Sequence, residues 1–271
     1  MFPQLLLIWR LTAKAWNHAV RVNPSLSCSN PIGPSDIPGV ARGLSLKEVE
    51  ATRGDFITAA LRAEKAGFDG VEVHAAFGWL IMQFLSPGFN LRTDRYGGCL
   101  ESRARFLFEI IDGIRAACRK DFQIGLRISM ERYGVPLADI REVATRAIRE
   151  DTIDYLDLAV WDYQKVAFET PFTGRSLLSV FTDLPRLSVR VGASGYVMTA
   201  QQAAEVLDAG CDFVMMGKAA ILDPDLPRHI EMDHAYRAPA LPVASEWLRQ
   251  SGLSERFIAY MRTREGFVLD R

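Results

Sequence analysis

The feature that most constrains the fold is a regular alternation of short apolar segments with amphipathic ones. After residue 45, apolar segments typical of strands begin near positions 71, 123, 154, 188 and 213, so successive starts are 52, 31, 34 and 25 residues apart. A strand with its following helix takes about 30 residues. The spacing therefore predicts a β/α repeat with one long insertion after the strand at 71. Because these strands are apolar on both faces, we expect a parallel sheet covered by helices.

Local signals predict where the elements begin and end. Ser45 with Glu48 forms a capping box that opens a helix, which Gly67 ends. Thr199 caps a later helix that ends at Gly210. Apolar residues at helical spacing predict two further helices, over 100–118 and 137–149. The expected strands are 71–74, 123–129, 153–160, 187–191 and 212–217, with a sixth over 2–8.

The repeat predicts a TIM (β/α)₈-type barrel over residues 1–230, followed by a C-terminal loop and closing helices over residues 231–271. A closed barrel needs eight strands, and the chain supplies about six, so we expect an incomplete barrel. No strand is followed by G-x-G-x-x-G, and no Walker motif is present. The pattern therefore does not favour a dinucleotide fold or a P-loop fold.

Composition and charge narrow the classes of partner. An apolar content of 49% with 24% charged residues excludes a disordered chain. Lys and Arg number 32 against 33 Asp and Glu, which is not the basic balance of a nucleic-acid binder. The apolar segment Phe2–Trp9 is too short to cross a membrane, and Arg10 and Lys14 follow it, whereas a signal peptide carries its charge first. The four cysteines form no C-x-x-C pair, so we expect a cytoplasmic protein without a metal site.

One segment closely resembles a known family. Residues 64–106 read EKAGFDGVEVHAAFGWLIMQFLSPGFNLRTDRYGGCLESRARF. This is similar to the Old Yellow Enzyme family, also called the NADH:flavin oxidoreductase or NADH oxidase family, with its pattern A-G-F-D-G-V-E-I-H, then Q-F-L-S-P, N-x-R-x-D-x-Y-G-G and N-R-x-R-F. Ser102 stands in place of the last Asn. The resemblance continues at Gly125–Ser129, Gly192–Gly195 and Val214–Pro224.

The resemblance implies a TIM barrel that holds FMN at the carboxyl ends of its strands and takes hydride from NAD(P)H. Phosphate sites in such barrels lie on the loops after the last two strands. Glycines there allow close approach of backbone N–H groups, and a lysine supplies a point charge where the family usually has arginine. The residues expected to bind the cofactor are Gln4, Arg127, Ser194, Gly195, Gly217 and Lys218.

Arg127 interrupts an apolar strand, where an unpaired charge is costly. The resemblance implies that it contacts the pyrimidine edge of the flavin and favours the reduced form electrostatically. An ion pair within the barrel is the alternative.

The resemblance makes His74 the residue that hydrogen-bonds the carbonyl oxygen of the substrate. Two positions differ from the family. Phe77 stands where a second His or Asn usually lies, and Trp79 stands where a Tyr usually protonates the substrate's α-carbon. An indole N–H is only a hydrogen-bond donor and cannot act as a general acid at neutral pH. These differences argue against ordinary enone reduction, but not against flavin redox chemistry.

We therefore expect an FMN-dependent oxidoreductase that passes hydride from NAD(P)H through the flavin to an enone, a quinone or O₂. The alternative is a truncated, non-catalytic remnant of the family that binds FMN weakly. By resemblance, the strand over 2–8 is the third of eight, so two βα units would precede Met1. The open strand edges of such a barrel would favour self-association.

Overall fold

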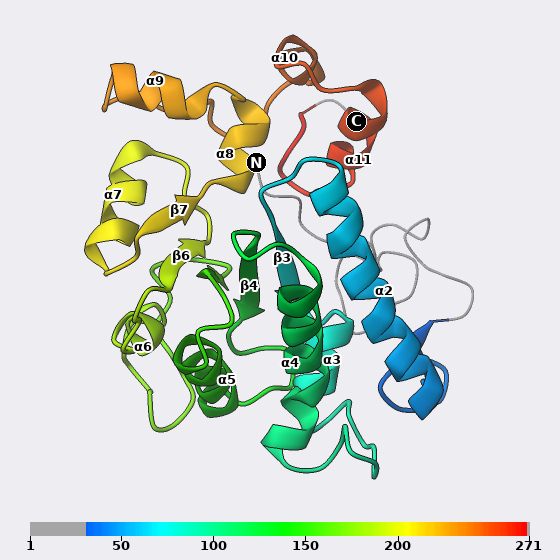
Figure 1. Cartoon of the computed structure of the whole chain (residues 1–271). Helices are drawn as coiled ribbons and strands as arrows, with labels where there is room; N and C mark the ends of the chain where they lie inside the picture. The colour runs from blue at the N-terminus through cyan, green and yellow to red at the C-terminus, as the bar shows by residue number, and fades with distance from the viewer. Residues whose placement is uncertain (1–30, 270–271) are drawn as a thin grey trace.

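The computed structural model of the chain describes residues 31–269. At its centre lies a parallel five-stranded sheet in the order β3-β4-β5-β6-β7, with helices around it (Figure 1). The strands are β3 (Gly70–Ala75), β4 (Gln123–Ser129), β5 (Tyr155–Ala159), β6 (Arg190–Ser194) and β7 (Phe213–Met215). The helices between them are α3 (Leu80–Leu85), α4 (Leu100–Ala117), α5 (Leu137–Arg149), α6 (Ser179–Thr182) and α7 (Ala200–Asp208).

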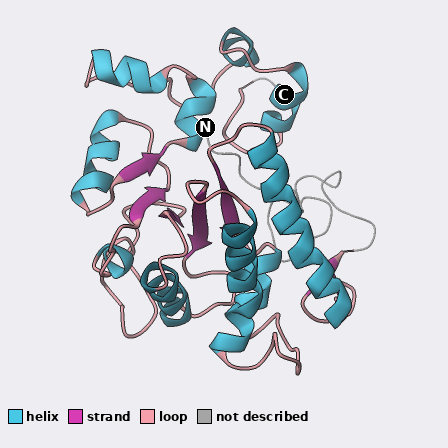
Figure 2. Cartoon of the chain, in the orientation of Figure 1, coloured by secondary structure: helices cyan, strands magenta, loops and turns pink. Residues whose placement is uncertain are grey.

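Figure 2 shows the central strands with helices around them, and the remaining elements come at the two ends of the described chain. Before the sheet come β1 (Ile32–Gly33), β2 (Arg42–Gly43) and α2 (Leu46–Lys65). After it come α8 (Gly217–Leu222), α9 (Leu226–Met232), α10 (Ser245–Gln250) and α11 (Glu255–Arg262). Helices α8, α10 and α11 share a small hydrophobic cluster built on Leu222, Leu248 and Ile258. The domain boundary expected at residue 230 stays a prediction.

The sequence signals that open and close the helices are confirmed. The Ser45 side chain accepts a hydrogen bond from the Glu48 N–H, and the Glu48 carboxylate accepts one from the Ser45 N–H at 2.8 Å. Thr199 caps α7 in the same way, through the Gln202 N–H. Gly67 and Gly210 follow their helices with φ of 85° and 96°, which an L side chain rarely adopts.

Three strand predictions were wrong in their bounds. Strand β5 covers Tyr155–Ala159 rather than 153–160. Strand β6 begins at Arg190 rather than at Leu187. Leu187 has a φ of 48° and a side chain that is 74% exposed, so it lies on the turn before the sheet. Strand β7 ends at Met215, because the chain enters α8 at Gly217.

Each strand pairs with the next one in the chain, as expected of consecutive β/α units. Within residues 31–269, β3 and β7 are the outer strands of the sheet. The strand predicted over 2–8 lies outside the described residues. The total number of barrel strands therefore stays a prediction, whereas the α/β class with its parallel sheet is confirmed.

Glycine and aromatic residues alternate along the inner face of the sheet. A Cβ on Gly125 would lie 2.0 Å from the Tyr155 ring, and one on Gly192 would lie 2.1 Å from the Phe213 ring. The two rings meet edge to face at 5.7 Å between centroids. The glycines thus provide the space in which these large side chains fill the interior.

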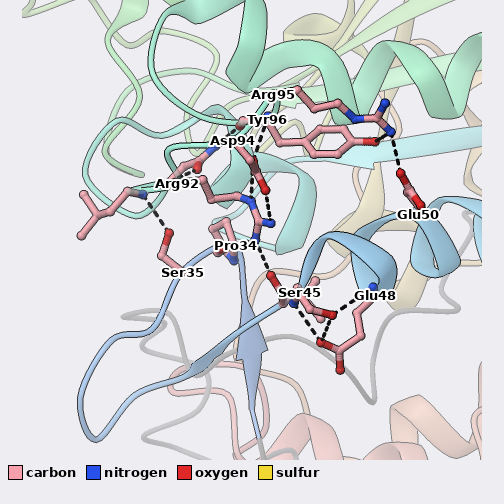
Figure 3. A network of polar contacts seen from close by, with 12 residues as sticks. Pro34, Ser35, Ser45, Glu48, Glu50, Arg92, Asp94, Arg95 and Tyr96 are labelled. Atoms are coloured by element: carbon pink, nitrogen blue, oxygen red, sulfur yellow. Dashed lines mark hydrogen bonds and ion pairs between the residues drawn. The ribbon is translucent and has the colours of Figure 1, made fainter.

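The N-x-R-x-D-x-Y-G-G motif in the insertion after β3 has a structural role. The Asn90 amide donates to the carbonyls of Phe84 and Tyr96, both at 2.7 Å. Arg92 pairs with Asp94 at 2.5 Å and donates to the carbonyls of Pro34 and Leu44 (Figure 3). The most specific motif of the sequence therefore fastens the segment before α2 to the insertion.

No helix within residues 31–269 is long and apolar enough to cross a membrane.

Candidate functional site

Strained backbone gathers in the loops that follow the strands. Phe77 after β3, Glu131 and Arg132 after β4, and Tyr196 after β6 have φ values of 56°, 54°, 76° and 57°. Such conformations cost about 1–3 kcal/mol each and persist where the surroundings impose them, as they do at functional sites. The Phe77 N–H, for example, donates to the Ser129 hydroxyl at 3.0 Å. The carboxyl ends of the strands are therefore the candidate site.

A buried ionic cluster surrounds Arg127 on the inner face. The sheet register aligns His74 with Arg127 and Arg127 with Asp157. The Arg127 guanidinium lies 2.9 Å from a carboxylate oxygen of Asp157 and 3.9 Å from one of Glu72, and it donates to the Ser194 hydroxyl at 2.9 Å. Both carboxylates are at most 1% exposed. The ion pair that was given above as the alternative to a flavin contact of Arg127 is therefore present.

Sequence reasoning missed Glu72 and Asp157, although a signal was available. Each carboxylate interrupts an apolar strand, as Arg127 does, and alternates with apolar neighbours on the same face as His74 or Arg127. Burial raises the pKa of Asp157 to about 6, while Arg127 acts to lower it. Two buried carboxylates thus share one guanidinium.

One donor of Arg127 remains available to an acceptor. Its Nε is buried and has no hydrogen-bond partner among the described residues. An unmade hydrogen bond to a buried charged group is costly. This orphaned donor fits a group from outside the chain that brings a hydrogen-bond acceptor to the end of β4.

His74 is a neutral hydrogen-bond donor. Its Nδ1 accepts a hydrogen bond from the Ala76 N–H at 3.1 Å, so the ring proton belongs on Nε2. Burial, and then the positive charge of Arg127, lower the pKa of His74 to about 4. The imidazole therefore stays uncharged at neutral pH and can donate from Nε2 to a carbonyl oxygen.

We expect His74 to show no titration between pH 8 and pH 5.5, where an ordinary histidine with a pKa near 6.5 would become mostly protonated. The measurement is nitrogen NMR of the ring nitrogens, with His74→Gln used to assign the signals. A protonated His74 at pH 5.5, or a proton on Nδ1, would contradict the assignment.

The four residues predicted for the phosphate end have different surroundings. Ser194 contacts Arg127, as described above. A Cβ on Gly195 would lie 2.5 Å from the Val160 side chain, so packing against the end of β5 already requires this glycine. A Cβ on Gly217 would meet no atom within 4 Å. The Lys218 ammonium is exposed and lies 4.8 Å from the centroid of the Tyr196 ring.

Two predicted site residues remain to be placed in the structure, Trp79 and Gln4. Trp79 is half-buried at the N-cap of α3, on the same turn as Phe77, and its backbone N–H donates to the Ala76 carbonyl at 3.1 Å. Gln4 lies outside the described residues. The structure thus brings together His74 on β3, Arg127 on β4 and Ser194 on β6. The role of each predicted residue toward a cofactor stays a prediction.

The fold is that of an α/β protein with a parallel sheet, and the candidate site lies at the carboxyl ends of its strands. The chain belongs to the NADH:flavin oxidoreductase / NADH oxidase family, whose sequence model matches residues 8–236. This confirms the family inferred from residues 64–106. It also confirms FMN as the cofactor of the family, with NADH or NADPH as the donor.

Relatives and solved structures agree with the family. The chain is 34% identical over 204 residues to a probable NADH-dependent flavin oxidoreductase, YqiG, of Bacillus subtilis, covering 72% of this chain and 55% of that protein. It is 32% identical over 206 residues to an NADPH dehydrogenase of Bacillus pumilus, covering 73% and 60%. Morphinone reductase in complex with tetrahydroNAD superposes with a TM-score of 0.65 at 26% identity, over 95% of this chain and 70% of that one. The chain thus spans somewhat more than half the length of these two curated relatives.

Proposed function

We propose that the chain acts as an FMN-dependent oxidoreductase that takes hydride from NAD(P)H and passes it to an enone, a quinone or O₂. The observation that carries the proposal is Arg127, a buried guanidinium with an orphaned Nε, aligned with a neutral His74 on the next strand. FMN, when bound, supplies the hydride transfer itself, and the protein binds and orients the reactants.

Arg127 and Lys218 are the residues that would hold the cofactor. Arg127 can donate from Nε to an acceptor on the pyrimidine edge of the flavin and place a positive charge there. Asp157 and Ser194 fix its guanidinium, so little reorganisation is needed. Lys218 supplies an exposed positive charge beyond β7 for the phosphate, next to Gly217, where the backbone is open. The orphaned donor and the exposed cation fit the two polar ends of FMN.

His74 would orient the acceptor. Its Nε2–H can donate to a carbonyl oxygen, and a neutral donor polarises that carbonyl without giving up a proton. Trp79 cannot supply a proton to carbon, because an indole N–H is not acidic at neutral pH. Acceptors that need no protonation at carbon, such as a quinone or O₂, are therefore favoured over enones.

We expect the protein to oxidise NAD(P)H with a quinone or O₂ faster than with cyclohexenone. A general acid contributes typically about 10²–10⁴-fold in rate. Trp79→Tyr should therefore raise the cyclohexenone rate at least severalfold and leave the quinone rate nearly unchanged. Steady-state kinetics with the matched control Trp247→Tyr, on α10, would measure this. Rapid cyclohexenone turnover by the parent, or no gain in the variant, would contradict the role given to Trp79.

The alternative function is a non-catalytic remnant of the family that binds FMN weakly. Visible absorbance of the purified chain, followed by titration with FMN, distinguishes the two. A yellow protein with one flavin per chain supports the oxidoreductase. A colourless protein that takes up little added FMN supports the remnant. Size-exclusion chromatography of the same sample tests self-association, which stays a prediction.

A further inference from the structure

An aromatic surface lies at the carboxyl ends of β3, β4 and β5. It consists of Phe77, Tyr133 and Trp161, with Arg132 beside it. The Trp161 indole N–H donates to the Tyr133 hydroxyl at 3.0 Å. The Phe77 ring meets both other rings edge to face, at 6.4 Å from Tyr133 and 6.3 Å from Trp161. The Arg132 guanidinium lies 5.4 Å from the centroid of the Trp161 ring.

This aromatic surface is continuous with the candidate site. The rings of His74 and Phe77 have centroids 5.6 Å apart, and the Arg127 guanidinium lies 5.4 Å from the centroid of Phe77. A path of rings therefore leads from His74 through Phe77 to Trp161. Trp161 is 58% exposed although its ring is held by a hydrogen bond. An indole fixed in place but open to solvent suits contact with a flat ligand.

A buried ion pair and strained backbone hold the surface in place. Glu131 is fully buried, and its carboxylate contacts the Lys165 ammonium at 2.7 Å and the Phe168 N–H at 2.9 Å. These contacts join the loop after β4 to the loop that carries Trp161. Glu131 and Arg132 both have positive φ, a strained conformation that persists because the surrounding contacts impose it. The strained pair leads directly into Tyr133.

Arg132 adds a charge to the surface. It is exposed, and it forms no ion pair with any residue that the structure describes. A guanidinium over an indole ring is favourable and still leaves its N–H donors available. The surface therefore offers a flat apolar face with a cation at its rim.

We propose that the aromatic surface binds the fused-ring part of a planar, anionic aromatic substrate whose carbonyl lies at His74. The proposal rests on the oxidoreductase function for the position of the carbonyl. Phe77 and Trp161 follow one another along the path, with ring centroids 6.3 Å apart, so a fused ring system can cover more of both rings than a single ring can. Arg132 pairs with the acidic substituent.

The test is calorimetric titration of the full chain, once without FMN and once with oxidised FMN added. The ligands are naphthalene sulfonate, its neutral counterpart naphthalene methanol, and the single-ring benzene sulfonate. The parent should bind naphthalene sulfonate about tenfold more tightly than benzene sulfonate. Trp161→Leu should weaken both naphthalene ligands about tenfold. Arg132→Gln should weaken both sulfonates and leave naphthalene methanol unchanged.

Two controls match these variants. Phe168→Leu removes an equally exposed ring from the same loop, and Arg256→Gln removes an exposed arginine from α11. Neither should change binding. The proposal is overturned if Trp161→Leu binds like the parent, if Arg132→Gln loses the neutral ligand equally, or if the parent does not prefer the fused ring. Ligand binding measured without FMN tests the aromatic surface by itself. Absence of NAD(P)H turnover would instead show that the proposed oxidoreductase function fails.

Discussion

Replacing Arg127 with leucine is expected to destabilise the protein by about 3–5 kcal/mol and to abolish FMN retention. The change leaves the carboxylates of Asp157 and Glu72 buried without their guanidinium, and removing one partner of a buried ion pair typically costs that much. Urea unfolding would measure the loss of stability, and visible absorbance after desalting would measure retained flavin.

The destabilisation should be smaller at pH 5 than at pH 8. The folded-state pKa of Asp157, about 6, lies above that of an ordinary aspartate, so its buried charge opposes folding above that pKa and is relieved by protonation as the pH falls. Losing Arg127 raises this pKa further and also removes a cause of the low pKa of His74. Both changes favour proton binding by the folded variant, and both therefore lessen the damage in acid.

The double variant Arg127→Leu/Asp157→Asn separates the structural role of Arg127 from its role toward FMN. It removes a buried charge of each sign and should recover much of the lost stability. It should still fail to retain FMN, because the donor to the flavin is absent. If either variant retains flavin with an unchanged reduction potential, the position given to Arg127 is wrong.

Gly97→Ala is expected to lower the stability by about 3 kcal/mol, although the residue lies outside the candidate site. A Cβ at this position would lie 1.9 Å from the Arg92 carbonyl oxygen, and backbone cannot move aside as a flexible side chain can. The strain would also loosen the hydrogen bonds from Arg92 to Pro34 and Leu44. Thermal unfolding should show a fall in Tm of roughly 5–10 °C.

The matched control for this prediction is Gly54→Ala. Gly54 lies within α2, and a Cβ there would meet no atom within 4 Å. Alanine is the better helix former, so this variant should gain about 0.5–1 kcal/mol. Equal stability of the Gly97→Ala variant and the parent would show that the N-x-R-x-D-x-Y-G-G motif does not fasten the fold as described.

The elements and their order could be predicted from the sequence because their signals are local. The capping box of Ser45 and Glu48, the helical spacing of apolar residues over 137–149 and the apolar segment over 123–129 each act within a few residues. Arg127 stood out for the same reason, as a charge on an apolar strand, whereas His74 was identified by its place in the family motif. The start of β6 was predicted too early, because the sequence does not reveal that the apolar Leu187 lies on a left-handed turn before the strand.

The tertiary structure alone decided what surrounds those residues. Asp157 faces Arg127, and Ser194 binds it, only because three parallel strands align in one register. The pKa of His74 is lowered because the folded sheet buries it beside Arg127, and Gly195 packs closely against Val160. Local sequence fixes helices and strands through interactions within a few residues. Burial, charge pairing and ring contacts instead depend on residues about 30 or more positions apart, which only the folded sheet brings together.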